Sequence, residues 1–389
     1  MKPASLVVAS ALVLTASLAA AQQGVTKTEI TIGTIQDMSG PLASFGKQAR
    51  FGMQLRIDEL NEQGGVHGRK IKLLLEDSGY DPKKAVLGAQ KLVNQDKIFI
   101  MAGHVGTAHN NAAFPVQVDK NIINFLPISS ARDMYEPFHK LKYSFGVPYS
   151  DQMRMAVPKL AKEKNAKRVC TVYQDDDYGL EVQQGTEAGL KTIGMEVVEK
   201  TSFKRGATDF SSQVAKLKAS NCDFVVLGTI IRETIGVVGE SRKTGFNPIF
   251  LTPNAAYTDL IPKLGGKIVD NVYATMTVQH PYLDEASQPL RFWANKYKTK
   301  FNEDPGTLSI YGYQIIDIFI RAAQKVGPNL TTDSFIKAMD TMNVPPDIFG
   351  ADAMVFTATK RLSGNASRIS QIQDGRWRVI SEYTKPNPG

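Results

Sequence analysis

The feature that most constrains the fold is a repeated alternation of short β-rich runs and longer amphipathic runs, with no hairpin signals between them. A strand is expected over 29–35, a helix over 46–63 that ends at Gly64-Gly65, and a second strand over 71–76. Strands that are separated by helices pair in parallel, with the helices packed on both faces of the sheet. The alternation continues with helices at 82–94 and 107–118 and strands at 98–102 and 122–127.

The pattern then begins a second time, which predicts an α/β protein with two doubly wound parallel-sheet lobes. We place the junction between the lobes near 146–150. Beyond it, strands are expected at 167–173, 196–201, 223–228 and 249–252, with helices at 180–193, 210–218 and 234–244 between them. Periodicity alone does not assign the late elements to a lobe: helices at 288–301, 306–326 and 332–342, and strands at 353–356, 368–373 and 377–381.

Composition excludes several other classes of protein. The chain of 389 residues has a formal net charge of +8, but its Lys and Arg residues are scattered and form no long run. We expect no nucleic-acid partner, because phosphate binding needs basic charge gathered on one face. The longest apolar stretch after the N-terminus, 310–323, is interrupted by Tyr311, Gln314, Asp317 and Arg321. We therefore expect no membrane-spanning helix there.

The first residues have the pattern of a secretory signal peptide, expected over 1–21. Lys2 gives the positive start, residues 6–20 are apolar and small, and Ala19 to Ala21 provide the small residues that cleavage requires. A membrane anchor is the alternative, but the run is shorter than the roughly 20 strongly apolar residues of a spanning helix. We expect cleavage and a mature chain that is free in an extracytoplasmic space.

The two cysteines, Cys170 and Cys222, are open to two interpretations. A disulfide between them is possible in an oxidising compartment. Each, however, lies in or beside an apolar strand-like run, where a buried free thiol is the commoner finding. Sequence spacing does not give the geometry that a disulfide needs, so we favour free thiols and leave the pairing open.

The motifs that would indicate an enzyme are absent or incomplete. Gly40 and Gly46 are separated by five residues, where a phosphate loop has four, and Gln48 stands where that loop has a metal-binding hydroxyl. His104 and His109 lack the spacing and the partners of a zinc site. The chain has neither a Gly-x-Ser-x-Gly elbow nor a dinucleotide fingerprint. We expect no catalysis, no cofactor and no metal site.

A glycine-dense turn at 103–108 is the strongest candidate for a binding site. It ends one expected strand and opens the next helix, so free backbone amides, the helix dipole and the Thr107 hydroxyl would receive a small carboxylate. The next strand ends in Pro127, Ile128, Ser129 and Ser130, which puts more hydroxyls on the same edge. The alternative is that these Ser and Thr residues only cap helices.

These residues resemble a known family, the substrate-binding proteins of ABC importers for branched-chain amino acids, amides, urea-like compounds and aromatic acids. The resemblance runs through the mature chain and is carried by Met38 to Gly46, Glu59 to Gly65, Glu76-Asp77, Gly103 to Thr107, Pro127 to Ser130 and Asp177 to Gly179. It implies a type I periplasmic binding protein whose two lobes are joined by a three-crossing hinge. The implied lobes are 22–147 with 275–355 and 148–274 with 356–389.

The resemblance also implies which residues bind the ligand. Thr107 with the backbone of Gly106 and Ala108, and Ser130 with the Ile128 carbonyl, fall where the family holds the carboxylate and the neighbouring polar atoms of its ligand. Ser129 belongs to the same edge, Phe45 falls at an aromatic lining position, and Tyr178 matches the ligand-facing tyrosine of the second lobe. The chain departs from the amino-acid binders at two positions: Ile230 replaces an aromatic residue, and Asn254 replaces the acidic partner of the ligand ammonium.

Those departures favour an acid without an ammonium group, because a buried ammonium without a counter-charge is costly. Arg232 could pair with an anionic group, and His104 and Tyr257 could line the pocket; Asp175 could instead replace the missing acid. We therefore expect a periplasmic, non-enzymatic receptor that captures a small aromatic or aliphatic carboxylate and delivers it to the permease subunits of an ABC importer. The alternatives are a branched-chain amino-acid receptor and a ligand sensor without a transport partner.

Overall fold

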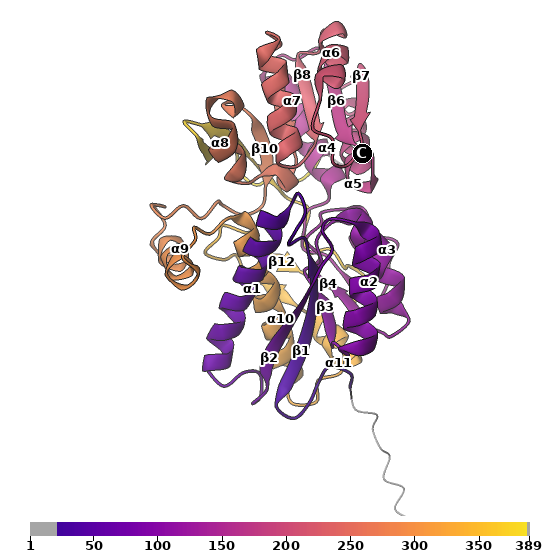
Figure 1. Ribbon diagram of the computed structural model, residues 1–389, viewed down its shortest axis with the longest axis vertical. Helices are drawn as coiled ribbons and strands as arrows, with labels where there is room; N and C mark the ends of the chain where they lie inside the picture. The colour runs from indigo at the N-terminus through magenta and orange to yellow at the C-terminus, as the bar shows by residue number, and fades with distance from the viewer. Residues whose placement is uncertain (1–21, 387–389) are drawn as a thin grey trace, which may run out of the picture.

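A computed structural model describes residues 22–386 and shows two α/β lobes, one above the other (Figure 1). The expected signal peptide lies outside the described residues. Within them, no helix combines the length and the apolar character needed to cross a membrane.

The first lobe is built on a five-stranded sheet in the order β2-β1-β3-β4-β5, and every strand pair in it is parallel. The order reverses between β1 and β3, which is the point where open α/β sheets form a crevice at the carboxyl ends of their strands. The strands are β1 (Glu29–Gln36), β2 (Lys70–Asp77), β3 (Ile100–Ala102), β4 (Ile123–Phe125) and β5 (Lys142–Tyr143).

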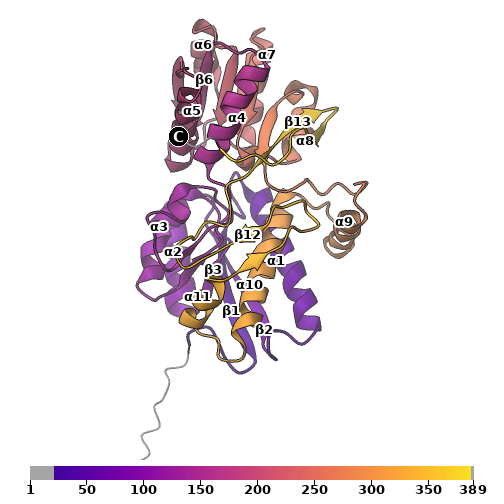
Figure 2. The ribbon, with the colours of Figure 1, turned by 180° about the vertical axis from the view of Figure 1, so that it is seen from behind.

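Helices from two parts of the chain, far apart in the sequence, cover this sheet. The helices from the N-terminal part are α1 (Ala43–Glu62), α2 (Pro82–Gln90) and α3 (Thr107–Val118). The helices α10 (Thr307–Val326) and α11 (Thr332–Met339) return to the same lobe (Figure 2). Phe319 of α10 and Phe335 of α11 pack on Phe125 of β4, with ring centroids 6.3 and 5.4 Å away.

The helices α1 and α10 approach each other closely because both carry glycine at the contact. A Cβ atom on Gly52 would lie 1.9 Å from the Ser309 carbonyl oxygen, and one on Gly312 would lie 2.2 Å from the Ala49 carbonyl oxygen. No side chain larger than hydrogen fits at either position without moving a backbone. This contact fixes α10 against α1 and so holds the N-terminal end of α10 beside the crevice.

The second lobe has a seven-stranded sheet in the order β14-β13-β10-β9-β8-β6-β7. Its parallel part comprises β6 (Val169–Gln174), β7 (Glu199–Phe203), β8 (Phe224–Gly228), β9 (Ile249–Thr252) and β10 (Tyr273–Met276). The strands β13 (Arg368–Gln373) and β14 (Arg376–Val379) add an antiparallel edge. Its helices are α4 (Tyr149–Glu163), α5 (Asp177–Lys191), α6 (Ser211–Ala219), α7 (Arg232–Lys243) and α8 (Leu260–Gly265).

The chain passes between the lobes three times: between β5 and α4, between β10 and α9 (Gln288–Phe301), and between the short strand β12 (Met354–Val355) and β13. The third passage stays with the first lobe up to residue 363, since the Ser144 amide donates to the Arg361 carbonyl at 2.8 Å and the Ser363 amide donates to the Ser144 carbonyl at 3.0 Å. The short strand β11 (Asn343–Val344) pairs with β12. The late helices and late strands are thus divided as the family resemblance implied, whereas the residue limits given for the lobes stay a prediction.

Our preference for free thiols was wrong. Cys170 and Cys222 form a disulfide, with Cα atoms 5.9 Å apart. Cys170 lies in β6, and Cys222 lies two residues before β8, the strand that pairs with β6 in parallel. The bridge therefore ties together two neighbouring strands of the second sheet, near the ends where those strands begin.

Candidate functional site

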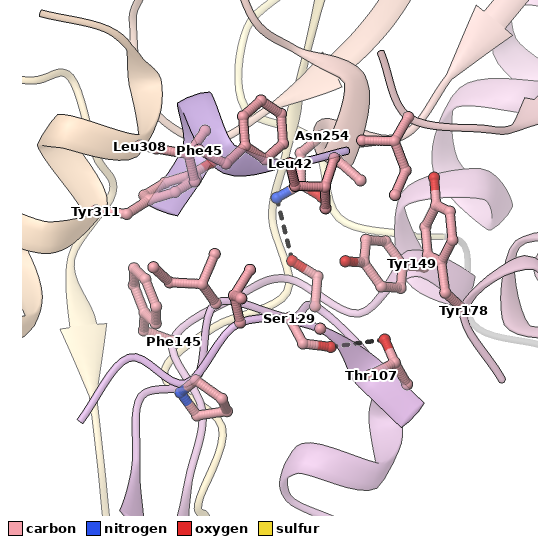
Figure 3. A pocket seen from close by; sticks show the side chains of 18 of the residues that line it. Leu42, Phe45, Thr107, Ser129, Phe145, Tyr149, Tyr178, Asn254, Leu308 and Tyr311 are labelled. Atoms are coloured by element: carbon pink, nitrogen blue, oxygen red, sulfur yellow. Dashed lines mark hydrogen bonds between the residues drawn. The ribbon is translucent and has the colours of Figure 1, made fainter. Parts of the chain in front are cut away.

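A pocket lies between the lobes, and side chains from the first lobe, the second lobe and the hinge all line it (Figure 3). The carboxyl ends of β3, β8 and β9 lead into lining residues, as expected for crevices of open α/β sheets. The lining residues are Leu42, Phe45, Tyr80, Val105, Gly106, Thr107, Pro127, Ile128, Ser129, Ser130, Phe145, Gly146, Tyr149, Tyr178, Ile230, Asn254, Ala255, Thr277, Leu308 and Tyr311.

The start of α3 forms one polar part of the wall. Gly106 precedes the helix with a φ of 93°, and a Cβ atom there would lie 2.4 Å from His109 Nδ1, so only glycine fits without a shift. The Thr107 hydroxyl is 2.9 Å from the Ser129 hydroxyl. The first-turn amides of a helix have no carbonyl within the helix to bind, so those of Thr107 and Ala108 remain available to an acceptor.

The amide of Gly106 does not belong to this set of free donors. It donates to the Ile128 carbonyl oxygen at 3.1 Å, and the Ile128 amide donates back to the His104 carbonyl at 3.0 Å. These two bonds fix the turn after β3 against the turn after β4. The expectation that Gly106 would offer a free amide is therefore corrected: it positions Thr107 and leaves the Ile128 carbonyl with one partner.

A hydrogen-bond network from the second lobe reaches the serines. Asn254 Nδ2 donates to Ser130 Oγ at 3.1 Å, and Gln152 Nε2 donates to Asn254 Oδ1 at 3.0 Å. The Asn254 amide in turn donates to Gln152 Oε1 at 2.9 Å. Because both ends of the Gln152 amide are held, the side chain of Asn254 is oriented before any ligand arrives, and its Nδ2 group faces the first lobe.

The remaining wall is mainly aromatic and aliphatic. Tyr178 packs edge-on against Tyr149, with centroids 4.9 Å apart, and its hydroxyl donates to the Thr229 carbonyl at 2.7 Å. Burial raises the pKa of both phenols above the usual range, so both are neutral. In the view of Figure 3, Phe145 and Tyr311 lie on the side away from Thr107 and Tyr178.

Among residues 22–386, those that line the pocket include no aspartate, glutamate, lysine, arginine or histidine. The charge of a bound ion would therefore have to be met by amides, hydroxyls and the carboxamide of Asn254. Free amides and hydroxyls donate to a carboxylate at little cost, whereas a buried ammonium would find only neutral oxygen acceptors.

Of the twelve residues predicted for the site, nine line the pocket, and His104, Ala108 and Arg232 do not. His104 is completely buried below the turn, and burial lowers its pKa to about 3. Arg232 begins α7 and is half-exposed, 3.7 Å from the Glu233 carboxylate. It lines a smaller neighbouring cavity that shares Leu42, Tyr80 and Ile230 with the main pocket.

The two residues weighed as alternatives also lie elsewhere. Tyr257 is outside the lining and its hydroxyl accepts from the His280 amide at 3.1 Å. Asp175 forms an ion pair with Lys204. Sequence reasoning missed Tyr149, Leu308 and Tyr311, which come from an unpredicted helix and from a late helix that periodicity could not place.

Comparison with known proteins identifies the family. A family model described as "Periplasmic binding protein" matches residues 29–376, and the chain belongs to this family. It is of the leucine-binding-protein-like type I: the "Leu/Ile/Val/Thr-binding protein" of Salmonella typhimurium is 28% identical over 247 residues, 64% of this chain and 67% of the relative.

Solved structures agree on the fold. A "Fatty acid ABC transporter substrate-binding protein" from Thermomonospora curvata superposes with a TM-score of 0.84 at 23% identity, covering 94% of this chain and 95% of that one. A solute-binding protein from R. palustris in complex with benzoate gives 0.81 at 16% identity, covering 92% and 97%. The names of these relatives describe binding proteins, not enzymes, and they span amino acids, fatty acids and benzoate.

Proposed function

We propose that this chain is a periplasmic receptor that captures a small carboxylate without an ammonium group, aromatic or aliphatic, and hands it to the permease subunits of an ABC importer. The observation that carries the proposal is the pairing of free donors at the start of α3 with a lining that has no acidic side chain. Phe45, Tyr178, Ile230 and the other apolar residues would enclose the tail of the acid. Lobe closure would enclose the ligand, with the hydrogen bond from Asn254 to Ser130 joining the second lobe to the first.

The position of Thr107 gives the first test. Replacing Thr107 by Ala should weaken the tightest carboxylate ligand by about 1 to 3 kcal/mol, roughly 5- to 150-fold, because a charge-assisted hydrogen bond in a dry pocket is lost. Isothermal titration calorimetry would measure the change. Thr186→Ala is the matched control, since Thr186 is equally buried and its hydroxyl bonds inside α5. Equal affinities for T107A and wild type would contradict the assignment.

Amino-acid binding is the second candidate, favoured by the name of the Salmonella relative. The variant Asn254→Asp separates the two candidates, because it adds the counter-charge that an ammonium needs. We expect it to bind amine-free acids at least about tenfold more weakly and to gain affinity for leucine or valine. A thermal-shift screen of wild type against benzoate-like acids, aliphatic acids and amino acids provides the baseline. Stabilisation of wild type by leucine but by no amine-free acid would overturn the proposal.

A further inference from the structure

A second cavity lies at the hinge and shares a wall with the ligand pocket. We call it the hinge cavity; its lining includes residues from all three passages of the chain between the lobes. Three residues, Phe145, Thr277 and Tyr311, line both spaces. The hinge cavity holds about 400 Å³, its opening included, against about 710 Å³ for the ligand pocket. Its other lining residues include the apolar Val147, Val278 and Met354 and the polar Gln314, Asp352 and Ser363.

The shared wall is an aromatic pair. The ring of Phe145 meets the ring of Tyr311 edge-on, with centroids 5.6 Å apart and planes at 86°. The Tyr311 hydroxyl is 3.4 Å from the Thr277 hydroxyl, which is a long contact for a hydrogen bond between two hydroxyls. Figure 3 shows the pair on the apolar side of the pocket, away from Thr107. A ligand held by its carboxylate at α3 would thus direct its tail toward this pair.

The backbone on either side of the pair is fixed, so that only the side chains form the partition. The Phe145 carbonyl accepts from Ser363 Oγ at 3.1 Å, from the third passage of the chain. Tyr311 precedes Gly312, whose close approach to α1 fixes that turn of α10. Trimming either ring should therefore open the partition without relocating the chain.

We propose that the Phe145–Tyr311 pair determines ligand specificity by limiting the length of the apolar tail, and that the hinge cavity is the space a longer tail would enter. The inference rests on the proposed function for the orientation of the ligand. It concerns tail length alone, so it can be tested separately from the chemistry of the head group.

The test is a chain-length profile. Affinities of straight-chain carboxylates from butanoate to decanoate would be measured by calorimetry for wild type, Phe145→Ala and Tyr311→Ala. In wild type we expect affinity to rise with length and then fall once the tail reaches the pair. In the trimmed variants the optimum should move to acids longer by about two to four methylene groups, because each newly buried methylene strengthens binding about fourfold.

Two further variants keep the result interpretable. Phe51→Ala removes a partly buried ring that stacks on Phe301 outside both cavities, and its length profile should match that of wild type. Phe145→Leu replaces the ring with a smaller aliphatic side chain and removes less volume than Phe145→Ala. It takes the place of the alanine variants if these do not fold, as judged by their melting without ligand. An optimum at the same length in wild type and in all folded trimmed variants, with every acid weakened equally, would overturn the inference.

Failure of the proposed function would look different. If wild type binds leucine and no amine-free acid, the head-group assignment fails, and the same variants are then compared with α-amino acids of increasing side-chain length. If neither series binds, xenon-pressurised crystals test the partition directly, because apolar cavities take up xenon. Xenon density that crosses the position of the missing ring in Phe145→Ala would support the partition, and two still-separate sites would overturn it.

Discussion

The two lobes use similar parallel sheets, yet they bury different groups near the pocket. The first lobe places two histidines, His104 and His109, under the turn that opens α3, and both are completely buried. The second lobe ties β6 to the start of β8 with a disulfide and sets Glu181 of α5 against the first lobe. The first lobe thus carries neutral groups that acid would charge, whereas the second carries a covalent tie and an acid that base would charge.

This difference shows how the work of binding is divided. Most of the pocket wall, including the donors at α3, comes from the first lobe and the hinge. The second lobe contributes fewer groups, among them Tyr178, Ile230 and Asn254. Substitutions in one lobe at a time should therefore change different properties. Loss of the disulfide should lower the free energy of unfolding without changing ligand affinity, the histidines should make stability sensitive to acid, and Glu181 should make it sensitive to alkali.

The largest effect is expected from the disulfide. Replacing both Cys170 and Cys222 by Ala should lower the free energy of unfolding by about 4 kcal/mol, because the bridge spans 52 residues of the unfolded chain. Urea unfolding would measure it. Amide hydrogen exchange should become faster in β6 and β8 far more than in β1 and β3. Ligand affinity should stay unchanged, because the bridge lies away from the carboxyl ends of the strands, where the pocket is. Equal loss of protection in both sheets would remove the contrast between the lobes.

The histidines should make the first lobe sensitive to acid. Burial lowers the pKa of His104 to about 3 and that of His109 to about 4, below the usual 6.5. At pH values between about 4 and 6.5, these two imidazoles bind more protons in the unfolded chain than in the folded one. The free energy of unfolding therefore falls as the pH drops below about 6.5. Together the pair should cost about 3 kcal/mol between pH 6.5 and pH 5.

Unfolding curves at several pH values measure this acid dependence. His104→Leu should lose about half of it, while the double cysteine variant should keep all of it. An unchanged slope in His104→Leu would show that other groups cause the acid sensitivity.

Glu181 should give a smaller effect with the opposite sign. Desolvation raises its pKa to about 7, against the amide of Arg132 and the amide and hydroxyl of Ser150, which lower it. The folded state then holds a proton that the unfolded state releases, so stability falls as the pH rises from about 4.5 through 7. Because Glu181 is only partly buried, we expect Glu181→Gln to gain about 1 to 2 kcal/mol relative to wild type between pH 5 and pH 8.

Glu181 lies at the contact between the two lobes. The Arg132 amide of the first lobe donates to Glu181 at 2.9 Å across the interface between the lobes. Paired unfolding curves of wild type and E181Q at the two pH values test the stability effect. If the difference between them does not change with pH, Glu181 is ionised throughout and the contrast with the histidines disappears.

Much of the fold could be predicted from local pattern. The helix at 107–118 and the strands at 249–252 and 368–373 begin and end where periodicity placed them. The helix α4 was missed because it contains Pro158 and begins in a segment that resembled a junction. The pairing of the cysteines depends on how β6 and β8 lie in the sheet, which their spacing in the sequence does not reveal.

The candidate site was predictable only where its residues follow a strand within a few positions. Thr107 comes five residues after β3, Ser129 and Ser130 come four and five residues after β4, and Asn254 follows β9 after Pro253. Leu308 and Tyr311 reach the pocket because α10 packs on α1 from more than two hundred residues away, through backbone contacts at Gly52 and Gly312. Gln152, which orients Asn254, lies 102 residues from it. Such pairs depend on tertiary packing that no local pattern contains.

The three passages of the chain have one more consequence. Phe145 and Gly146 belong to the first passage, and Thr277 directly follows β10 at the start of the second, so the hinge itself forms part of the pocket wall. A ligand in this pocket would contact the same segments that bend when the lobes part. A substitution at Gly146 or Thr277 would therefore change the shape of the pocket and the hinge at the same time.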